Sequence, residues 1–72
     1  MSFVLDTSGQ RCPLPLLRAK QRMRALRPGD RLVVIATDPE AHVDFGAWAA
    51  VTGYELSTQA VGSRIELTVV KR

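Results

Sequence analysis

The 72-residue chain lacks most of what small metal-binding or disulfide-bonded domains depend on. It has one cysteine and one histidine, which excludes an internal disulfide and a zinc site built from four cysteine or histidine ligands. No apolar run approaches the roughly eighteen residues of a membrane span. The first residues have no basic segment followed by a long apolar run, so we expect no signal peptide. We therefore predict a protein of the reducing cytoplasm with no metal, cofactor or membrane partner.

Aromatic residues are also scarce, and acidic residues are absent from one long segment. Only Phe3 and Tyr54 are aromatic residues of expected strands, whereas RNA-binding sheets stack bases on several such side chains. We therefore do not expect direct nucleic-acid binding. Between Ser8 and Gly29 every charged residue is basic: Arg11, Arg18, Lys20, Arg22, Arg24 and Arg27. Such a segment either steers the protein toward an acidic partner or RNA, or is simply a solvated helix face.

What the chain does have is a cysteine in an unusual turn. Pro13 directly follows Cys12, and Pro15 comes two residues later, ahead of a long stretch without glycine. Proline is tolerated in the first turn of a helix, where N–H groups have no intrahelical partner. The thiol is then expected at or beside the N-cap, where the helix dipole and Arg11 favour the thiolate.

The two prolines also limit how strongly this thiol can be activated. If Cys12 is the N-cap, only the amide of Leu14 remains as a local donor to the sulfur. We therefore predict a modestly lowered pKa for an exposed, rigidly held thiol. The alternative is that Cys12 is a small buried hydrophobe, as free cysteines often are.

Residue patterns along the chain predict two helices and four strands. The expected elements are a strand over 3–7, a helix over 13–26, a strand over 32–36, a helix ending at Gly53, and strands over 54–60 and 65–69. The second helix begins either at Asp38 and Pro39 or at Asp44, and periodicity does not decide between them. Gly62 and Ser63 suit a two-residue type II′ hairpin.

This order predicts one α+β domain over residues 1–72. The expected architecture is a two-layer α/β sandwich, β-α-β-α-β-β, with two helices on one face of a mixed four-stranded sheet. The β-branched run over 32–36 is typical of a central strand. The expected core stripe of the first helix is Leu16, Ala19, Met23 and Leu26. On the second helix we assign Phe45 and Trp48 to the core and His42 to the surface.

The outer face of the first helix is a candidate docking surface. It carries Leu14, Leu17, Lys20 and Arg24, which fall outside the core stripe and follow Cys12 along the helix. Two exposed leucines beside a reactive cysteine favour a docking patch, although scattered surface leucines are also ordinary. Asp38 ends the strand expected to adjoin the first one. Its carboxylate either lies near Cys12, modulating the thiol or contacting a partner, or only caps a helix.

The segment from Leu5 to Pro15 resembles the TusA/SirA-like family of small sulfur carriers, whose signature is a Cys-Pro-x-Pro turn after a first strand. Residues that match the family pattern recur along nearly the whole chain: Leu5, Asp6, Gly9, Cys12, Pro13, Pro15, Pro28, Gly29, Asp30, Asp38, Pro39 and Asp44. Three positions depart from common family choices. Gln10 replaces a leucine, Gly46 replaces a proline, and Leu14 occupies a variable position that is glutamate in some members.

The resemblance implies a sulfur carrier, or sulfurtransferase, that holds sulfane sulfur as a persulfide on Cys12. Arg11, Pro13, Pro15 and Asp38 would support that cysteine. The implied donor is a cysteine desulfurase or a rhodanese. The implied acceptor is another sulfur carrier, or an enzyme that makes thiolated tRNA, a sulfur cofactor or an intermediate of sulfur oxidation. Such a protein acts in a relay and not as a stand-alone catalyst.

Two other classes of function stay open from the sequence. The chain is alternatively a regulatory or RNA-binding module that uses its basic first helix, or a thiol redox sensor.

Overall fold

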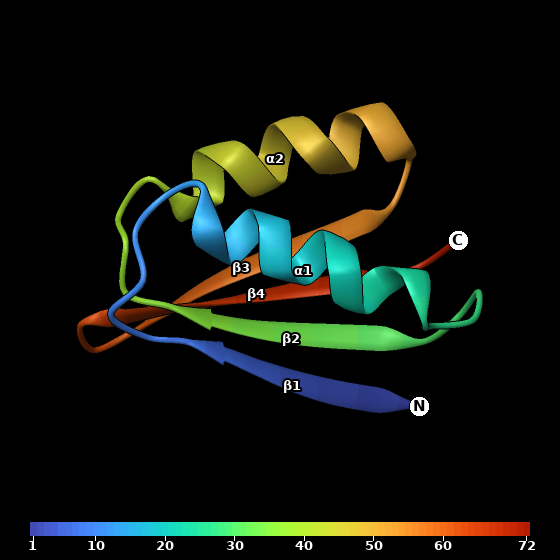
Figure 1. Ribbon diagram of the computed structural model, residues 1–72, viewed down its shortest axis with the longest axis horizontal. Helices are drawn as coiled ribbons and strands as arrows, with labels where there is room; N and C mark the ends of the chain where they lie inside the picture. The colour runs from blue at the N-terminus through green and yellow to red at the C-terminus, as the bar shows by residue number, and fades with distance from the viewer.

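The computed structural model describes residues 1–72 as a four-stranded sheet covered on one face by two helices (Figure 1). The elements are β1 (Ser2–Thr7), α1 (Leu14–Arg24), β2 (Arg31–Ala36), α2 (Ala41–Thr52), β3 (Glu55–Val61) and β4 (Arg64–Val70). The predicted α+β sandwich and its element order are confirmed. Neither helix is long and apolar enough to cross a membrane.

The sheet is mixed, with the strand order β1-β2-β4-β3. β1 pairs in parallel with β2, and β4 pairs antiparallel with both β2 and β3. β2 is therefore an interior strand, as its β-branched run predicts. The parallel pair sets Thr7 opposite Ala36 at one edge of the sheet. The loops that follow β1 and β2 consequently start side by side, and the Gly9 N–H donates a 2.8 Å hydrogen bond to Thr37 Oγ1 between them.

The core lies between the sheet and the two helices. Its largest fully buried apolar side chains include Leu32 and Val34 from β2, Leu67 and Val69 from β4, and Phe45 from α2, and α1 adds the fully buried Ala19. Phe45 packs edge-on against Trp48, with ring centroids 5.8 Å apart. Trp48 is partly buried against this core, so both aromatic residues lie where the sequence predicts.

α1 is shorter at both ends than the predicted helix over 13–26. Pro13 is its N-cap, and Leu26 lies beyond its end while remaining buried. The buried stripe within the helix is Pro15, Ala19 and Met23. Leu16, predicted to be core, is only half-buried. Pro15 therefore packs inward as well as restricting the backbone.

The last residues of the chain support the carboxyl end of α1. The ammonium group of Lys71 donates hydrogen bonds of 2.7 Å to the Met23 carbonyl and 2.8 Å to the Leu26 carbonyl. Terminal helix carbonyls lack intrahelical partners, and a cation near them also interacts favourably with the helix dipole. The end of β4 and the end of α1 are fastened together in this way.

α2 begins at Ala41, between the two predicted starts, so Asp38 is not its N-cap. Asp38 instead organises the turn before the helix: its Oδ1 accepts the Glu40 N–H at 3.0 Å, and its carbonyl accepts the Ala41 N–H at 3.1 Å. The helix ends at Gly53, which has a φ of 78° and confirms the predicted stop.

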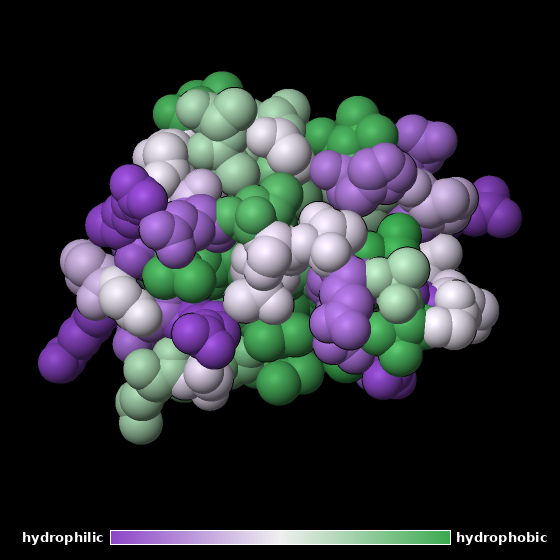
Figure 2. Space-filling view, turned by 180° about the vertical axis from the view of Figure 1, so that it is seen from behind, coloured by the Kyte–Doolittle hydropathy of each residue, from purple (hydrophilic) through white to green (hydrophobic).

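The β3–β4 hairpin closes over Gly62 and Ser63, because Val61 pairs with Arg64. Gly62 has a φ of 61°, and no residue other than glycine has a positive φ. A type I′ turn would need positive φ at both central residues, so the positive φ of Gly62 alone fits the predicted type II′ turn better than type I′. Seen from behind the view of Figure 1, polar and apolar side chains are interspersed over the surface (Figure 2).

Candidate functional site

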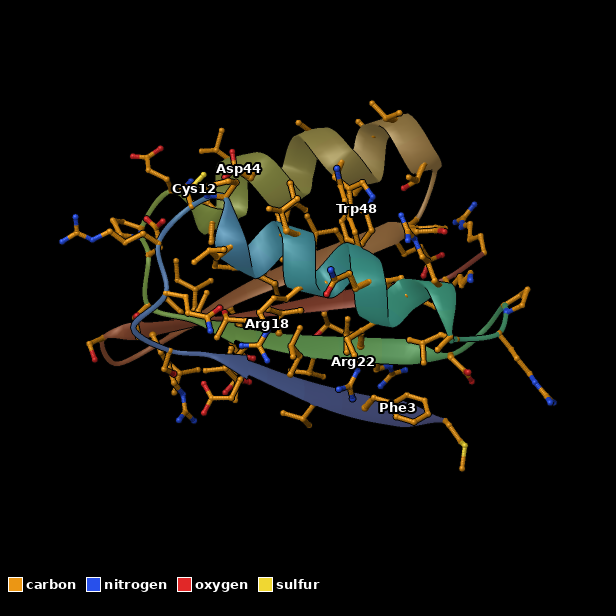
Figure 3. All side chains as sticks on the ribbon, in the orientation of Figure 1. Phe3, Cys12, Arg18, Arg22, Asp44 and Trp48 are labelled. Carbon is orange, nitrogen blue, oxygen red and sulfur yellow. The ribbon has the colours of Figure 1, made fainter.

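The single cysteine lies in the loop between β1 and α1, at the edge of the sheet where β1 and β2 end. Its side chain is exposed. It stands one residue before the N-cap Pro13, and the Cys12–Pro13 peptide bond is cis. Figure 3 shows the sulfur beside Asp44, at the start of α2. The thiol therefore sits where the two helices begin.

Two carboxylates hold Cys12, one through its backbone and one through its sulfur. The backbone N–H of Cys12 donates to Asp38 Oδ2, and its thiol donates to Asp44 Oδ2. Asp38 lies 26 positions further along the chain and Asp44 lies 32 positions further. The parallel pairing of β1 and β2 brings these distant residues to one edge. The sequence left open whether Asp38 lies near Cys12, and the structure places the two in contact.

The surroundings of the thiol favour its protonated form. The pKa of Cys12 is raised from 9.0 to about 11, first by the hydrogen bond to Asp44, then by desolvation and by the negative charges of Asp44, Asp38 and Glu40. The predicted lowering of this pKa is therefore wrong. The carboxylates that outweigh the helix dipole come from the second half of the chain.

Two nearby groups were expected to favour the thiolate, the Leu14 N–H and the charge of Arg11. Both act on other atoms. The Leu14 N–H donates a 2.9 Å hydrogen bond to the Arg11 carbonyl and not to the sulfur. The pKa of Asp38 is lowered, first by the Glu40 N–H, then by the Cys12 N–H and by the positive charge of Arg11. Arg11 thus acts on Asp38, and Asp38 stays ionised as the anchor of the turn.

The predicted outer face of α1 is open to solvent. Leu14 is 49% exposed and Leu17 is 47% exposed, and Lys20 and Arg24 are exposed as well. Sequence reasoning missed the contribution of α2 to the exposed apolar surface. Val43 and Val51 of α2 are also strongly exposed.

A groove runs between the two helices and reaches the site. Its lining comes from α1 and α2: Leu16, Lys20, Asp44, Ala47, Trp48 and Val51. Asp44 therefore faces both the thiol and the groove. An apolar segment of a partner lying in this groove would end beside the Cys12 sulfur.

The basic residues of α1 do not form one patch. Figure 3 shows Arg18 and Arg22 on the side of the helix toward β1. Lys20 and Arg24 point elsewhere, because they line a hollow together with Trp48 and Tyr54. A helix that binds an RNA backbone would need its cations on one side, so this division does not favour the nucleic-acid alternative.

Neither His42 nor a group of metal ligands adds to this site. His42 is exposed on α2 and forms no hydrogen bond with Cys12. No group of three or more histidine, cysteine, aspartate or glutamate residues is placed to hold a metal ion. Asp44 is the residue that sequence reasoning missed, since it had been treated only as a family match and a helix start. The signal was its place near the beginning of the second helix, at the same sheet edge as Cys12.

Comparisons with known proteins identify a family and a fold that this chain resembles. Residues 3–71 match the family model described as sulfurtransferase TusA. The sulfur carrier protein TusA of Allochromatium vinosum is 56% identical over 52 residues, which cover 72% of this chain and 68% of that protein. The putative sulfur carrier protein YrkF of Bacillus subtilis is 44% identical over 62 residues, 85% of this chain but only 34% of the relative. The crystal structure of a SirA-like protein from Desulfitobacterium hafniense superposes with a TM-score of 0.83 at 26% identity, covering 94% of this chain and 95% of that one.

Proposed function

The chain belongs to the TusA family of sulfurtransferases, and we propose that Cys12 is the residue on which it carries sulfur. Its function is that of a sulfur carrier, which receives sulfur from a donor protein and passes it to an acceptor protein. This confirms the function predicted from the sequence.

The observation that carries the proposal is the exposed thiol of the only cysteine, held on a rigid turn at the helix starts. Sulfur transfer between cysteines follows the course of thiol–disulfide exchange. The Cys12 thiolate attacks the terminal sulfur of a donor persulfide and forms a new S–S bond. The S–S bond of the donor breaks, and the donor cysteine leaves as a thiolate. The transferred sulfur then remains on Cys12 as a persulfide.

The surrounding residues support this role by fixing the sulfur in place. Pro13 restricts the backbone at the helix start, and Pro15 is buried on the inner face of the first turn of α1. Asp38 accepts the Cys12 N–H, and the positive charge of Arg11 helps to lower the pKa of Asp38. A sulfur that projects from such a turn suits entry into the active site of a partner protein. It is less suited to binding a small substrate of its own.

We propose that the donor is a cysteine desulfurase or a rhodanese, because both hold sulfur as a cysteine persulfide. The acceptor would be a further carrier or an enzyme that thiolates tRNA, builds a sulfur cofactor or oxidises sulfur. Both partners would approach over Leu14, Leu17, Lys20 and Arg24, where apolar and basic groups are exposed along the helix that follows the thiol. A cytoplasmic location is consistent with a single unpaired cysteine.

Mass spectrometry after incubation with a cysteine desulfurase and cysteine tests the proposal. We expect the protein to gain the mass of one sulfur atom, and a reductant to remove it. The Cys12→Ser variant should gain nothing. Sulfur gained equally by Cys12→Ser, or no gain by the native protein with desulfurases and rhodaneses alike, would overturn the assignment.

A further inference from the structure

We propose that Asp44 keeps the proton on Cys12 in the free carrier, and that a donor protein releases the thiolate by bringing a cationic side chain to Asp44. The inference rests on the proposed role of Cys12 as the sulfur-carrying residue. It adds a catalytic residue to the site and a chemical requirement on the partner.

The contact between the two side chains is the first observation. Asp44 Oδ2 accepts a hydrogen bond from the Cys12 thiol. Asp44 stands in the first turn of α2, where the helix dipole favours a negatively charged side chain. It forms no salt bridge with any basic residue of this chain. The carboxylate is therefore free to hold the thiol proton and to accept a cation from outside.

The other charged groups around the sulfur act in the same direction. Asp38 and Glu40, in the loop before α2, both disfavour a negative charge on Cys12. Arg11 is the neighbouring cation on the other side, and its charge acts on Asp38. From α1, Lys20 lines the groove that Asp44 also lines. No basic side chain of the chain donates a hydrogen bond to the sulfur, so the free carrier has little to stabilise a thiolate.

The transfer step can be written with its atoms balanced. The Cys12 thiol releases its proton to water once the cation of the donor offsets the charge of Asp44, and the thiolate attacks the outer sulfur of the donor persulfide. The bond from Cys12 to that sulfur forms as the donor S–S bond breaks. The donor cysteine leaves as a thiolate and takes up a proton from water. The transferred sulfur keeps its oxidation state, so no oxidant or reductant is needed.

A cationic group of the donor makes this step easier in two ways. It neutralises the negative field that opposes the thiolate, and it weakens the hold of Asp44 on the thiol hydrogen. Away from the donor, the protonated thiol reacts slowly with oxidants and electrophiles, because the thiolate is the reactive form. The same carboxylate would thus protect the Cys12 thiol of the unloaded carrier, and the cation of the donor would release it for reaction.

Asp44→Asn tests this, since the amide keeps the shape of the side chain and removes its charge. The measurement is the rate of Cys12 alkylation by iodoacetamide as a function of pH. In the native protein we expect the midpoint near 11, and in Asp44→Asn we expect it to move toward 9.0. Near neutral pH the variant should react about tenfold faster or more, because the thiolate fraction rises tenfold per unit of pKa.

Glu40→Gln is the matched control. It removes the same charge close to the same thiol but breaks no hydrogen bond to the sulfur. Its midpoint should move much less than that of Asp44→Asn. Should Asp44→Asn fail to fold, Asp44→Ala provides the same test with a residue that favours helix. Equal shifts in the Asp44 and Glu40 variants, or no shift in either, would overturn the inference.

A second measurement separates this inference from the proposed function. Sulfur uptake is followed from glutathione persulfide, which is small and anionic, and from a cysteine desulfurase. Asp44→Asn should accept sulfur faster than the native protein from glutathione persulfide, and should gain no such advantage with the desulfurase. An equal gain with both donors would refute the required cation. A native protein that takes sulfur from neither would refute the role of Cys12 itself.

Discussion

The carboxylate of Asp38 joins the two loops at the edge of the sheet, because one oxygen accepts the Cys12 N–H and the other accepts the Glu40 N–H. The turn that carries the thiol is thereby fastened to the end of β2. Helix packing alone would leave that turn free to move, since α1 begins only at Leu14. The position of the sulfur thus depends on a side chain from another part of the sequence.

Asp38→Ala should loosen this turn without disturbing the core. Both hydrogen bonds are lost, so we expect the melting temperature to fall by several degrees and sulfur uptake to slow. Asp38→Asn keeps one acceptor oxygen and should give a smaller effect. Thermal unfolding and mass spectrometry of the loaded protein measure the two quantities. Normal sulfur uptake in Asp38→Ala would mean that the turn is held by its prolines alone.

The effect of Asp38 on stability should also depend on pH. Its pKa is lowered below 3.8 in the folded protein, mainly by the hydrogen bonds from Glu40 and Cys12. The carboxylate therefore stabilises the fold above its unfolded pKa, and this contribution disappears as the pH falls through the folded value. The native protein and Asp38→Asn should differ in urea midpoint at neutral pH and converge in acid.

Changes on the outer face of α1 should weaken docking while leaving the fold intact. Leu17→Glu and Lys20→Glu each place a negative charge on this face, and both side chains are exposed. We expect slower sulfur transfer from the donor at limiting carrier. Arg22→Glu is the matched control, because Arg22 lies on the side toward β1 (Figure 3). Transfer that is unchanged in Leu17→Glu and Lys20→Glu would mean that the donor approaches by another face.

Alkaline pH should destabilise the fold through Cys12. The folded pKa of about 11 exceeds the unfolded value of 9.0, so above pH 9.0 the unfolded chain releases this proton before the folded protein does. The stabilisation is complete below the unfolded pKa and is lost as the pH rises toward the folded one. Urea unfolding under reducing conditions should show a steeper loss across this range in the native protein than in Cys12→Ser. Parallel curves would contradict the raised pKa.

Two glycines of α2 should respond to alanine in opposite directions. Gly46 lies inside the helix with open space where a Cβ would stand, so Gly46→Ala should stabilise the protein by about 1 kcal/mol. Gly53 ends the helix with a φ of 78°, so Gly53→Ala should destabilise it by about 1 kcal/mol. Chemical denaturation measures both changes. Equal effects of one sign would contradict the assigned helix end.

The elements of the fold were predictable because their signals are local. The β-branched run of β2 and the Gly62-Ser63 hairpin each occupy a few neighbouring residues, and both were placed correctly. The start of α2 was not, because Asp38 and Asp44 both look like capping residues in sequence. Asp38 instead closes the turn before the helix, and Asp44 lies in its first turn.

The chemistry of the thiol was not predictable in the same way. Cys12, Arg11 and the helix start are adjacent in sequence, and together they suggested a lowered pKa. Asp44 reverses this, and it reaches the sulfur only through the parallel pairing of β1 with β2 and the packing of α2. Periodicity and capping rules carry no information about such a contact.

The groups around the thiol come from both halves of the chain. The site therefore cannot be moved to another protein as one short segment. A peptide that carries only the Cys-Pro-Leu-Pro turn, grafted onto the start of a helix in another scaffold, would reproduce the cysteine and its prolines. It would lack the carboxylates of Asp38 and Asp44, which enter from after β2. Such a graft should behave as an ordinary helix-start cysteine, reactive toward any oxidant or electrophile. An engineered carrier with a guarded sulfur would need the β1–β2 pair and the first turn of α2 as one unit.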